Sequence, residues 1–310
     1  MTSGRNRSLN KSALYIQPNR FIDYLSIQLE APSQPFSIEN YVLFVDIDGT
    51  LAPFTLNPKD SIISNTTLTL LQDLQDCGVK IAAITGRSLG EAKQMLSPLS
   101  LPIAATHGLE IALEDSADSP DSIVSAVQVD TIELSHVKQA ITQVCMPYPD
   151  LTIEDKPYSV ALHYRQNPDL EDVASTIMST ALERYPDWLL KQGKYVWEIM
   201  PKGADKGTAI QVLLDKIRTD HALFPIFIGD DITDEVGFAA VQGIGGMGIK
   251  VGTEPTCAHY YVNDIDEVTM LLKSFLAFCQ SHVSVHSNFY QLHPNLAKNH
   301  YILSSKHRGK

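Results

Sequence analysis

The 310-residue sequence contains no apolar run that approaches the roughly 20 residues of a membrane-spanning helix. Basic residues near the N-terminus are not followed by an apolar segment, so we expect no secretory signal. The four cysteines are scattered without a CxxC pair, which argues against a zinc knuckle and fits a reducing cytoplasm. Basic residues are outnumbered, 24 against 36 acidic ones, and the net charge of -12 argues against nucleic acid as a partner. These absences predict a soluble cytoplasmic protein, and the hydrophobic content of 44% allows a sizeable core.

The stretch 41–51, YVLFVDIDGTL, has the clearest chemical pattern in the chain. Tyr41–Val45 is short and apolar, which is typical of a strand buried on both faces of a parallel sheet. The apolar run ends at Asp46, and Asp48 with Gly49 predicts a turn. Two carboxylates therefore follow the carboxyl end of a central strand, where open α/β sheets bind ligands. One can act as a nucleophile, and the other can transfer protons.

Apolar strands alternate with amphipathic helices along much of the chain, which predicts right-handed crossovers and a parallel sheet. Between them, short alternating strands and two helices predict an inserted α+β module. We therefore expect an α/β fold divided into an N-terminal extension at 1–40, the first part of a core at 41–112, the inserted module at 113–199, the second part of the core at 200–279 and a tail at 280–310. We favour partial disorder over a short helix for the extension, and a flexible segment for the histidine-containing tail.

Further polar residues follow other predicted strands or open a helix. Asp230 follows an apolar strand much as Asp46 does, and carboxylates from two strand ends can share one Mg²⁺ ion. Asp234 is expected to support that ion, although an acid at a helix start also compensates the helix dipole. Thr85 ends the second apolar strand of the core, 79–84, and can donate to a phosphate oxygen. Lys206 opens a helix, where a cation opposes the dipole, and such a placement is expected where function demands it.

Four elements of the sequence, taken in order, resemble the four motifs of the haloacid dehalogenase (HAD) superfamily of phosphotransferases. They are DxDGT at 46–50, Thr85, Lys206 and GDxxxD at 229–234. The resemblance implies a Rossmann-like core with a parallel sheet and an inserted α+β cap of the C2B type. It also implies that Asp46 forms an aspartyl phosphate, that Asp48 protonates the leaving alcohol and then activates water, and that Thr85 and Lys206 hold the phosphate.

The same resemblance implies one metal ion, Mg²⁺. Its expected ligands are Asp46, the Asp48 carbonyl and Asp230, with Asp234 in support.

Other segments narrow the resemblance to the trehalose-6-phosphate phosphatase family. They are DIDGTLAP (46–53), TGRS (85–88), HGLE (107–110), Glu154-x-Lys156, ALHYR (161–165), QGK (192–194), Glu198-Ile-x-Pro201 and GDDITDE (229–235). The resemblance implies Mg²⁺-dependent hydrolysis of trehalose 6-phosphate to trehalose and phosphate, the last step of trehalose biosynthesis. It also implies that the substrate is bound by Arg87, His107, Glu154, Lys156, His163, Arg165, Gln192, Lys194 and Glu198.

The implied partner is this small-molecule substrate, with no nucleic acid and no membrane. Because no glucosyltransferase segment is attached, a separate trehalose-6-phosphate synthase is a candidate partner. Two alternatives stay open. The chain could hydrolyse another sugar phosphate, such as a sucrose or mannosyl phosphate, although the cap motifs argue against it. It could also be a non-catalytic sensor of trehalose phosphate, but binding alone does not require a nucleophile.

Overall fold

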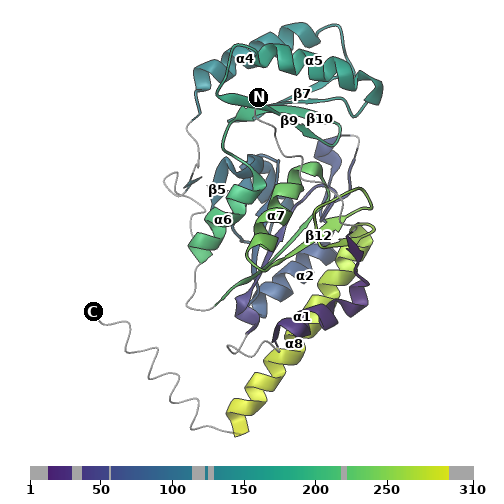
Figure 1. Ribbon diagram of the computed structural model, residues 1–310, viewed down its shortest axis with the longest axis vertical. Helices are drawn as coiled ribbons and strands as arrows, with labels where there is room; N and C mark the ends of the chain where they lie inside the picture. The colour runs from purple at the N-terminus through teal and green to yellow at the C-terminus, as the bar shows by residue number, and fades with distance from the viewer. Residues whose placement is uncertain are drawn as a thin grey trace, which may run out of the picture.

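The structure is a computed structural model that describes residues 13–29, 37–55, 57–113, 123–124, 129–217 and 222–292. These residues form a larger body around a nine-stranded sheet and a smaller body around a four-stranded sheet, which lies above it in Figure 1. Among them, no helix is both long and apolar enough to cross a lipid bilayer.

The larger sheet has the order β1-β13-β12-β11-β2-β3-β4-β5-β6. Its strands are β1 (Leu14–Tyr15), β2 (Tyr41–Val45), β3 (Lys80–Ile84), β4 (Ile103–Ala105), β5 (Glu110–Ala112), β6 (Ile123–Val124), β11 (Phe224–Gly229), β12 (Met247–Val251) and β13 (Tyr260–Val262). Neighbours from β1 to β4 pair in parallel, whereas β5 and β6 are antiparallel additions at one edge. The predicted parallel core is thus confirmed, with β2 at its centre.

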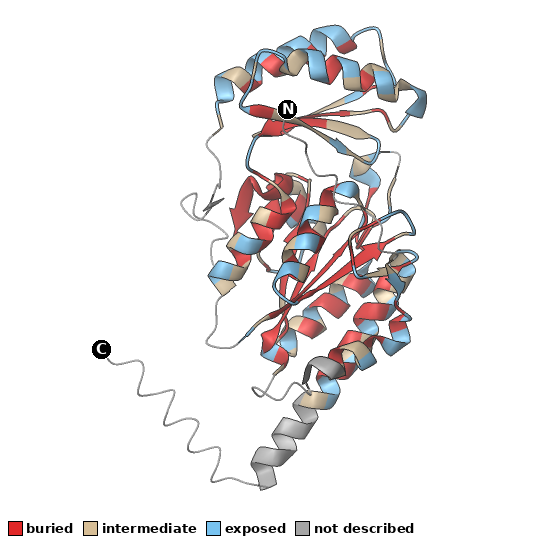
Figure 2. Ribbon diagram, viewed as in Figure 1, coloured by how far each residue is buried: buried red, intermediate tan, exposed pale blue. Residues whose placement is uncertain are grey.

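Within the described residues, helices cover both faces of this sheet (Figure 1). They are α1 (Phe21–Leu29), α2 (Asn65–Asp76), α3 (Leu89–Leu96), α6 (Lys206–Ile217), α7 (Glu235–Gly243) and α8 (Ile265–Leu292). Successive side chains of a strand point to opposite faces, and β2 supplies both hydrophobic layers for this reason. Tyr41, Leu43 and Val45 pack with α1, α2, α3 and α8, whereas Val42 and Phe44 pack with α6 and α7. Figure 2 shows the central strands of the larger sheet in red, and every residue of β2 is buried, as expected of a central parallel strand.

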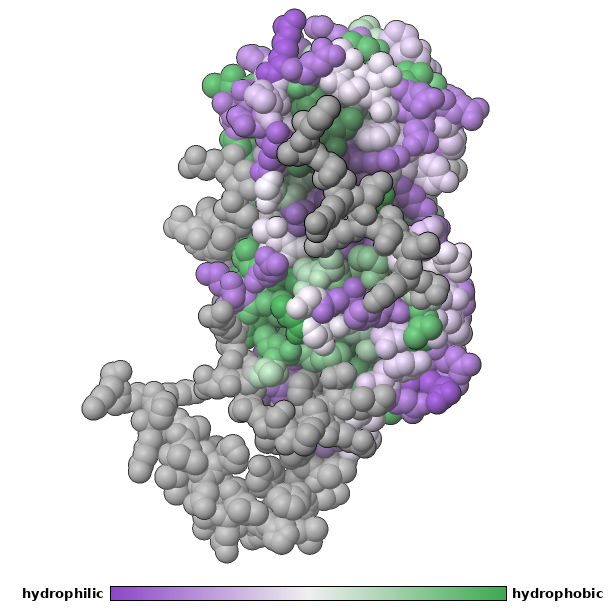
Figure 3. All heavy atoms as spheres, in the orientation of Figure 1, coloured by the Kyte–Doolittle hydropathy of each residue, from purple (hydrophilic) through white to green (hydrophobic). Residues whose placement is uncertain are grey.

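The smaller sheet has the order β7-β8-β10-β9 and is antiparallel throughout. Its strands are β7 (Thr152–Asp155), β8 (Val160–His163), β9 (Trp188–Gly193) and β10 (Val196–Pro201), and helices α4 (Thr131–Cys145) and α5 (Glu171–Leu182) cover one face. This body has its own hydrophobic cluster, built around Leu162, Ile177 and Trp188. On the face shown in Figure 3, hydrophilic residues are spread over its helices, and hydrophobic residues gather on the body below.

The N-terminal segment is more ordered than the sequence analysis favours. Residues 14–15 pair with β13, and Phe21 and Leu25 of α1 are fully buried. Phe21 packs edge-on against Phe275 of α8, with ring centroids 5.9 Å apart. Partial disorder is therefore wrong for this part of the extension, because its apolar residues complete the core beside α8.

Two further expectations need correction. The tail was expected to be flexible from residue 280, but helix α8 continues to Leu292, so the flexible-tail interpretation is wrong for 280–292. The short strand Ile123–Val124, expected in the inserted module, pairs with β5 of the larger sheet because backbone groups at that edge are open for pairing. Residues 114–122 of the expected inserted module and residues 293–310 of the expected tail lie outside the described residues.

Candidate active site

The predicted strand-end residues meet at one edge of the larger sheet. β11 and β3 flank β2 on either side, so Asp230, Asp46 and Thr85 follow three neighbouring parallel strands. The Asp46 backbone N–H donates to the Ile228 carbonyl, which fixes the start of the loop after β2. All three side chains are buried and line one cavity. This arrangement follows from parallel pairing, which places every strand's carboxyl end on the same side.

Lys206, the first residue of α6, pairs with the carboxylates of Asp46 and Asp234. Its Nζ lies 2.9 Å from Asp46 Oδ2 and 2.6 Å from Asp234 Oδ1, and the side chain is almost fully buried. Burial lowers the pKa of Lys206, but Asp234 and Asp46 raise it by more, so the ammonium is charged. Burial also raises the pKa of Asp46 well above its usual range, against the pull of Lys206.

Asp230 differs from its neighbours because neither of its buried carboxylate oxygens has a hydrogen-bond partner. The carboxylate pairs with Lys194, whose Nζ lies 3.6 Å from Oδ2. Burial, reinforced by Asp234 and Asp231, raises the pKa of Asp230 to about 7. Gly49 leaves room for this carboxylate: its φ is +78°, and a Cβ there would lie 2.0 Å from Asp230 Oδ2. The turn after β2 therefore requires glycine for its conformation and for space.

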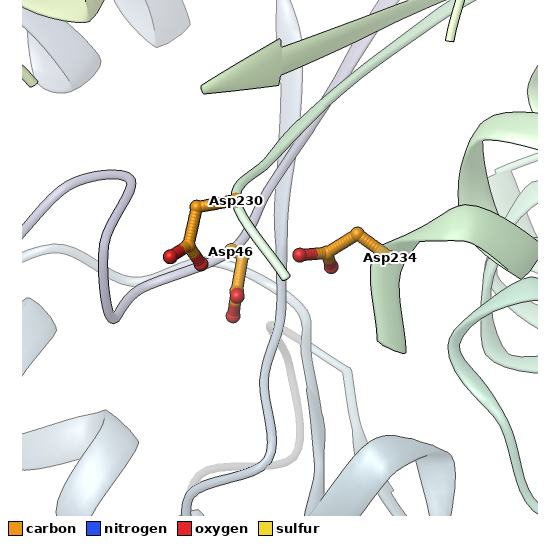
Figure 4. A group of neighbouring side chains, drawn as sticks. All are labelled: Asp46, Asp230 and Asp234. Atoms are coloured by element: carbon orange, nitrogen blue, oxygen red, sulfur yellow. The ribbon is translucent and has the colours of Figure 1, made fainter. Parts of the chain in front are cut away.

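Figure 4 shows Asp46 and Asp230 converging from two strand ends, with Asp234 facing them. One carboxylate oxygen from each lies within 4.8 Å of the others. Hard divalent cations favour such oxygen clusters, and two unpaired buried oxygens on Asp230 fit that chemistry. Asp234 is less available, since Oδ1 accepts from Lys206 and Oδ2 accepts from the Asp231 N–H.

Asp48 is held by Arg87, a pairing across 39 positions of the sequence. The guanidinium donates from Nε to Oδ2 and from Nη2 to Oδ1, each at 2.7 Å. Such bidentate contacts fix the orientation of a carboxylate as well as its charge. Arg87 also donates to the Pro58 carbonyl, so the Asp48 side chain is tied to the rim of the cavity.

The smaller body contributes a buried polar network around Glu198 of β10. Its carboxylate accepts from Lys156 Nζ at 3.2 Å and Ser159 Oγ at 2.6 Å, and His107 Nε2 of the larger body lies 3.2 Å away. Burial raises the pKa of Glu198, but Lys156 and His107 lower it by more. Burial lowers the pKa of His107 to about 3, so the imidazole is neutral and donates through Nε2.

Lys156 also donates to the Gly86 carbonyl at 2.7 Å, which joins the two bodies directly. Two more predicted residues pair nearby: Glu154 Oε2 lies 2.7 Å from His163 Nε2. Arg165 stacks over Phe54, with its guanidinium carbon 3.9 Å from the ring centroid, and donates to the Thr55 carbonyl.

Two adjoining cavities lie between the bodies. The first is lined by the strand-end residues, Lys206 and the Glu198 network. The second, of about 610 Å³, lies between β7 and the start of α3, where Gly90 forms part of its wall. The cavities share five lining residues: Pro58, Glu154, Lys156, His163 and Arg165. A molecule bound at the carboxylates can therefore extend toward α3.

The first cavity is lined by all but two of the residues predicted to act on substrate or metal, the exceptions being Asp234 and Gln192. Asp234 contacts the lining residue Lys206 instead. Gln192 is exposed and donates to Glu171 of α5 at 3.0 Å. Its neighbour Lys191, which the sequence analysis missed, lines the first cavity instead. The alternation of β9 could have revealed this, since Lys191 and Gly193 share a face that Gln192 does not.

Comparison of the sequence with known proteins identifies the family of this chain. A family model described as trehalose-phosphatase matches residues 44–266. The chain is 34% identical over 237 residues to trehalose-6-phosphate phosphatase of Escherichia coli strain K12, covering 74% of this chain and 84% of that protein.

Solved structures share the fold at lower sequence identity. The C-terminal domain of C. albicans trehalose-6-phosphate phosphatase superposes with a TM-score of 0.73 at 21% identity, covering 86% of this chain and 99% of that one. A haloacid dehalogenase-like hydrolase from Bacteroides thetaiotaomicron superposes with a TM-score of 0.56 at 19% identity, covering 76% and 99%. The core is thus a HAD-like phosphatase fold, and the chain belongs to the trehalose-phosphatase family of phosphoric monoester hydrolases.

Proposed function

We propose that this enzyme hydrolyses trehalose 6-phosphate to trehalose and inorganic phosphate, with Asp46 as the nucleophile and Mg²⁺ as the cofactor. The observation that carries the proposal is the buried set of Asp46, Lys206 and Asp230 at one sheet edge, open to a cavity between two bodies. The sequence similarity to trehalose-6-phosphate phosphatases supports the choice of substrate.

The residues divide the reaction between them. Asp46 attacks phosphorus and forms an aspartyl phosphate as the bond to the sugar oxygen breaks, and Asp48 supplies the proton that this oxygen needs. Asp48 then accepts a proton from water as the water attacks the aspartyl phosphate, which releases phosphate and restores Asp46. Lys206 neutralises charge on the phosphoryl oxygens, and Thr85 donates to one of them from the end of β3. Arg87 orients Asp48 at the cavity rim.

The unpaired Asp230 oxygens, together with Asp46 and the Asp48 carbonyl, are the groups that would hold Mg²⁺. When bound, the ion supplies positive charge to the transferring phosphoryl group. Asp234 supports the site by holding Lys206 and the loop after β11.

Removing the metal ion should abolish turnover reversibly. We expect chelation to lower the rate of phosphate release by more than about 100-fold, since a bound cation contributes several kcal/mol and about 1.4 kcal/mol is tenfold. Added Mg²⁺ should restore the rate, and Ca²⁺ should restore it poorly because it prefers more ligands and looser geometry. Asp230→Asn should raise the Mg²⁺ concentration needed for half-maximal activity. Full turnover by the metal-free enzyme would reject the metal site.

We further propose that the smaller body, with the sheet β7-β8-β10-β9, acts as a cap that binds the sugar. The substrate's phosphate would lie at Asp46, and its sugar rings would extend from the first cavity into the second. Glu154, His163 and Arg165 line both cavities and are placed to hydrogen-bond sugar hydroxyls along this path. Assignment of the cap to the C2B type, and its boundaries at 113 and 199, stay predictions.

Gly90 provides a steric test of this path, because it lies at the wall of the second cavity and an added Cβ would meet nothing within 4 Å. Gly90→Leu should fill part of the cavity without straining α3. We expect kcat/KM for trehalose 6-phosphate to fall about 5- to 150-fold, the equivalent of about 1–3 kcal/mol of overpacking. Gly90→Ala is the matched control and should retain activity. Hydrolysis of a small aryl phosphate should change little in either variant, and an equal loss for both substrates would show that the second cavity does not hold the sugar.

A further inference from the structure

Lys191 of β9 is a buried cation without a partner. Its Nζ is inaccessible to solvent and makes no hydrogen bond to any described residue. Placing an ammonium group in such a site is costly unless something compensates its charge. The side chain lines the first cavity, so a bound molecule can provide that compensation.

The natural partner of Lys191 within the protein is already taken. In the antiparallel ladder Lys191 stands directly opposite Glu198, and side chains opposite one another share a face of the sheet. Both Glu198 oxygens, however, lie within hydrogen-bond distance of groups from Lys156, Ser159 or His107. Lys191 therefore has no hydrogen-bond partner on this face of the sheet, because the Glu198 carboxylate is already bonded to other groups.

Carboxylates of the larger body near this cavity have cationic partners of their own. Asp46 and Asp234 both pair with Lys206, another buried ammonium at this cavity, and Asp230 Oδ2 lies 3.6 Å from Lys194 Nζ. Burial and the like charge of Lys206 lower the pKa of Lys191 to about 8, which still leaves the group mostly protonated at neutral pH. Lys191 and Lys206 are two of the four lysines that line this cavity, one from each body, and a dianion between them would compensate both charges.

We propose that Lys191 binds the phosphoryl group of the substrate, so that the smaller body completes the phosphate site that Lys206 begins in the larger one. This inference rests on the proposed function, because it requires a phosphate monoester at Asp46. It assigns β9 a role in binding the phosphoryl group, which all phosphate monoesters share, in addition to any contact with the sugar. A phosphate bound by both lysines would also link the two bodies while the reaction proceeds.

The test is Lys191→Met in the full chain with Mg²⁺ present. We expect the dissociation constant for inorganic phosphate, measured by calorimetry, to rise about 10- to 150-fold, the usual effect of losing a hydrogen bond to a charged group. The kcat/KM values for trehalose 6-phosphate and for a small aryl phosphate should fall by similar factors. The Tm should stay the same or rise, because Nζ has no partner in the described structure to lose. Lys191→Arg should recover part of the phosphate affinity.

Gln192→Met is the matched control, since this neighbouring side chain lies on the opposite face of β9 and contacts Glu171. It should bind phosphate as the wild-type enzyme does. Unchanged phosphate affinity in Lys191→Met would overturn the inference. If only trehalose 6-phosphate hydrolysis were then impaired, Lys191 would bind the sugar; if only the Tm fell, its role would be structural. A wild-type enzyme that neither binds phosphate nor hydrolyses either ester would instead reject the proposed function, and this inference with it.

Discussion

Asp46→Asn should reduce turnover of trehalose 6-phosphate by at least about 10⁴-fold, since removing a catalytic nucleophile in a well-studied hydrolase costs about 10⁶-fold. The asparagine amide is nearly the same size but cannot form the aspartyl phosphate. The site around it should survive, because Ile47 N–H can donate to an amide oxygen as it does to Asp46 Oδ1 at 2.8 Å. The measurement is single-turnover phosphate release, with far-UV circular dichroism to verify folding.

A binding control separates loss of chemistry from loss of the site. The Asp46→Asn enzyme should still bind trehalose 6-phosphate, because Lys206 and Thr85 remain in the cavity. Substantial turnover by a folded Asp46→Asn enzyme would mean that another group attacks phosphorus, and the assignment of the nucleophile would fail.

Lys206→Met should impair both stability and activity. The ammonium holds Asp46 and Asp234 in a buried cluster, and breaking such a pair by removing one partner costs about 3–5 kcal/mol of unfolding free energy. Loss of a positive group at the phosphoryl oxygens should also lower kcat by about 10²–10³-fold or more. Urea unfolding in the presence of chelator, together with steady-state kinetics, measures the two effects separately.

A double-mutant cycle locates the source of the instability. Lys206→Met should cost less stability in an Asp46→Asn background, because one of the carboxylates that it leaves unpaired is then neutral. Activity should not return in the double variant. Equal costs in both backgrounds would mean that the Asp46–Lys206 pair does not contribute to the stability of the site.

The sequence predicts the central strands well because strong local patterns determine them. Tyr41–Val45 has the same limits in the prediction and in the structure. A five-residue apolar run followed closely by a DG turn leaves few alternative positions for the ends of a strand. The apolar spacing also predicts a helix at about 89–96, and α3 has these limits, with Ser88 and Glu91 forming the capping box that begins it. Once such strands pair in parallel, Asp46, Thr85 and Asp230 must meet at one edge.

Edge strands and side-chain orientation are harder to predict because they depend on distant partners. The two-residue strands β1 and β6 form only by adding to an existing sheet edge, and no local pattern marks them. Whether Lys191 or Gln192 faces the cavity depends on the register of β9 against β10, and a shift of one residue reverses every side chain. The pairing of Arg87 with Asp48 likewise requires the fold to bring two loops together.

The central claim is that this chain removes phosphate from trehalose 6-phosphate in preference to other sugar phosphates. The most direct test is phosphate release by the purified chain from trehalose 6-phosphate, sucrose 6-phosphate, a mannosyl phosphate and glucose 6-phosphate, each with Mg²⁺ and with chelator. We expect Mg²⁺-dependent hydrolysis with the highest kcat/KM for trehalose 6-phosphate and none by Asp46→Asn. A higher kcat/KM for another sugar phosphate, or binding of trehalose 6-phosphate without hydrolysis, would contradict the account.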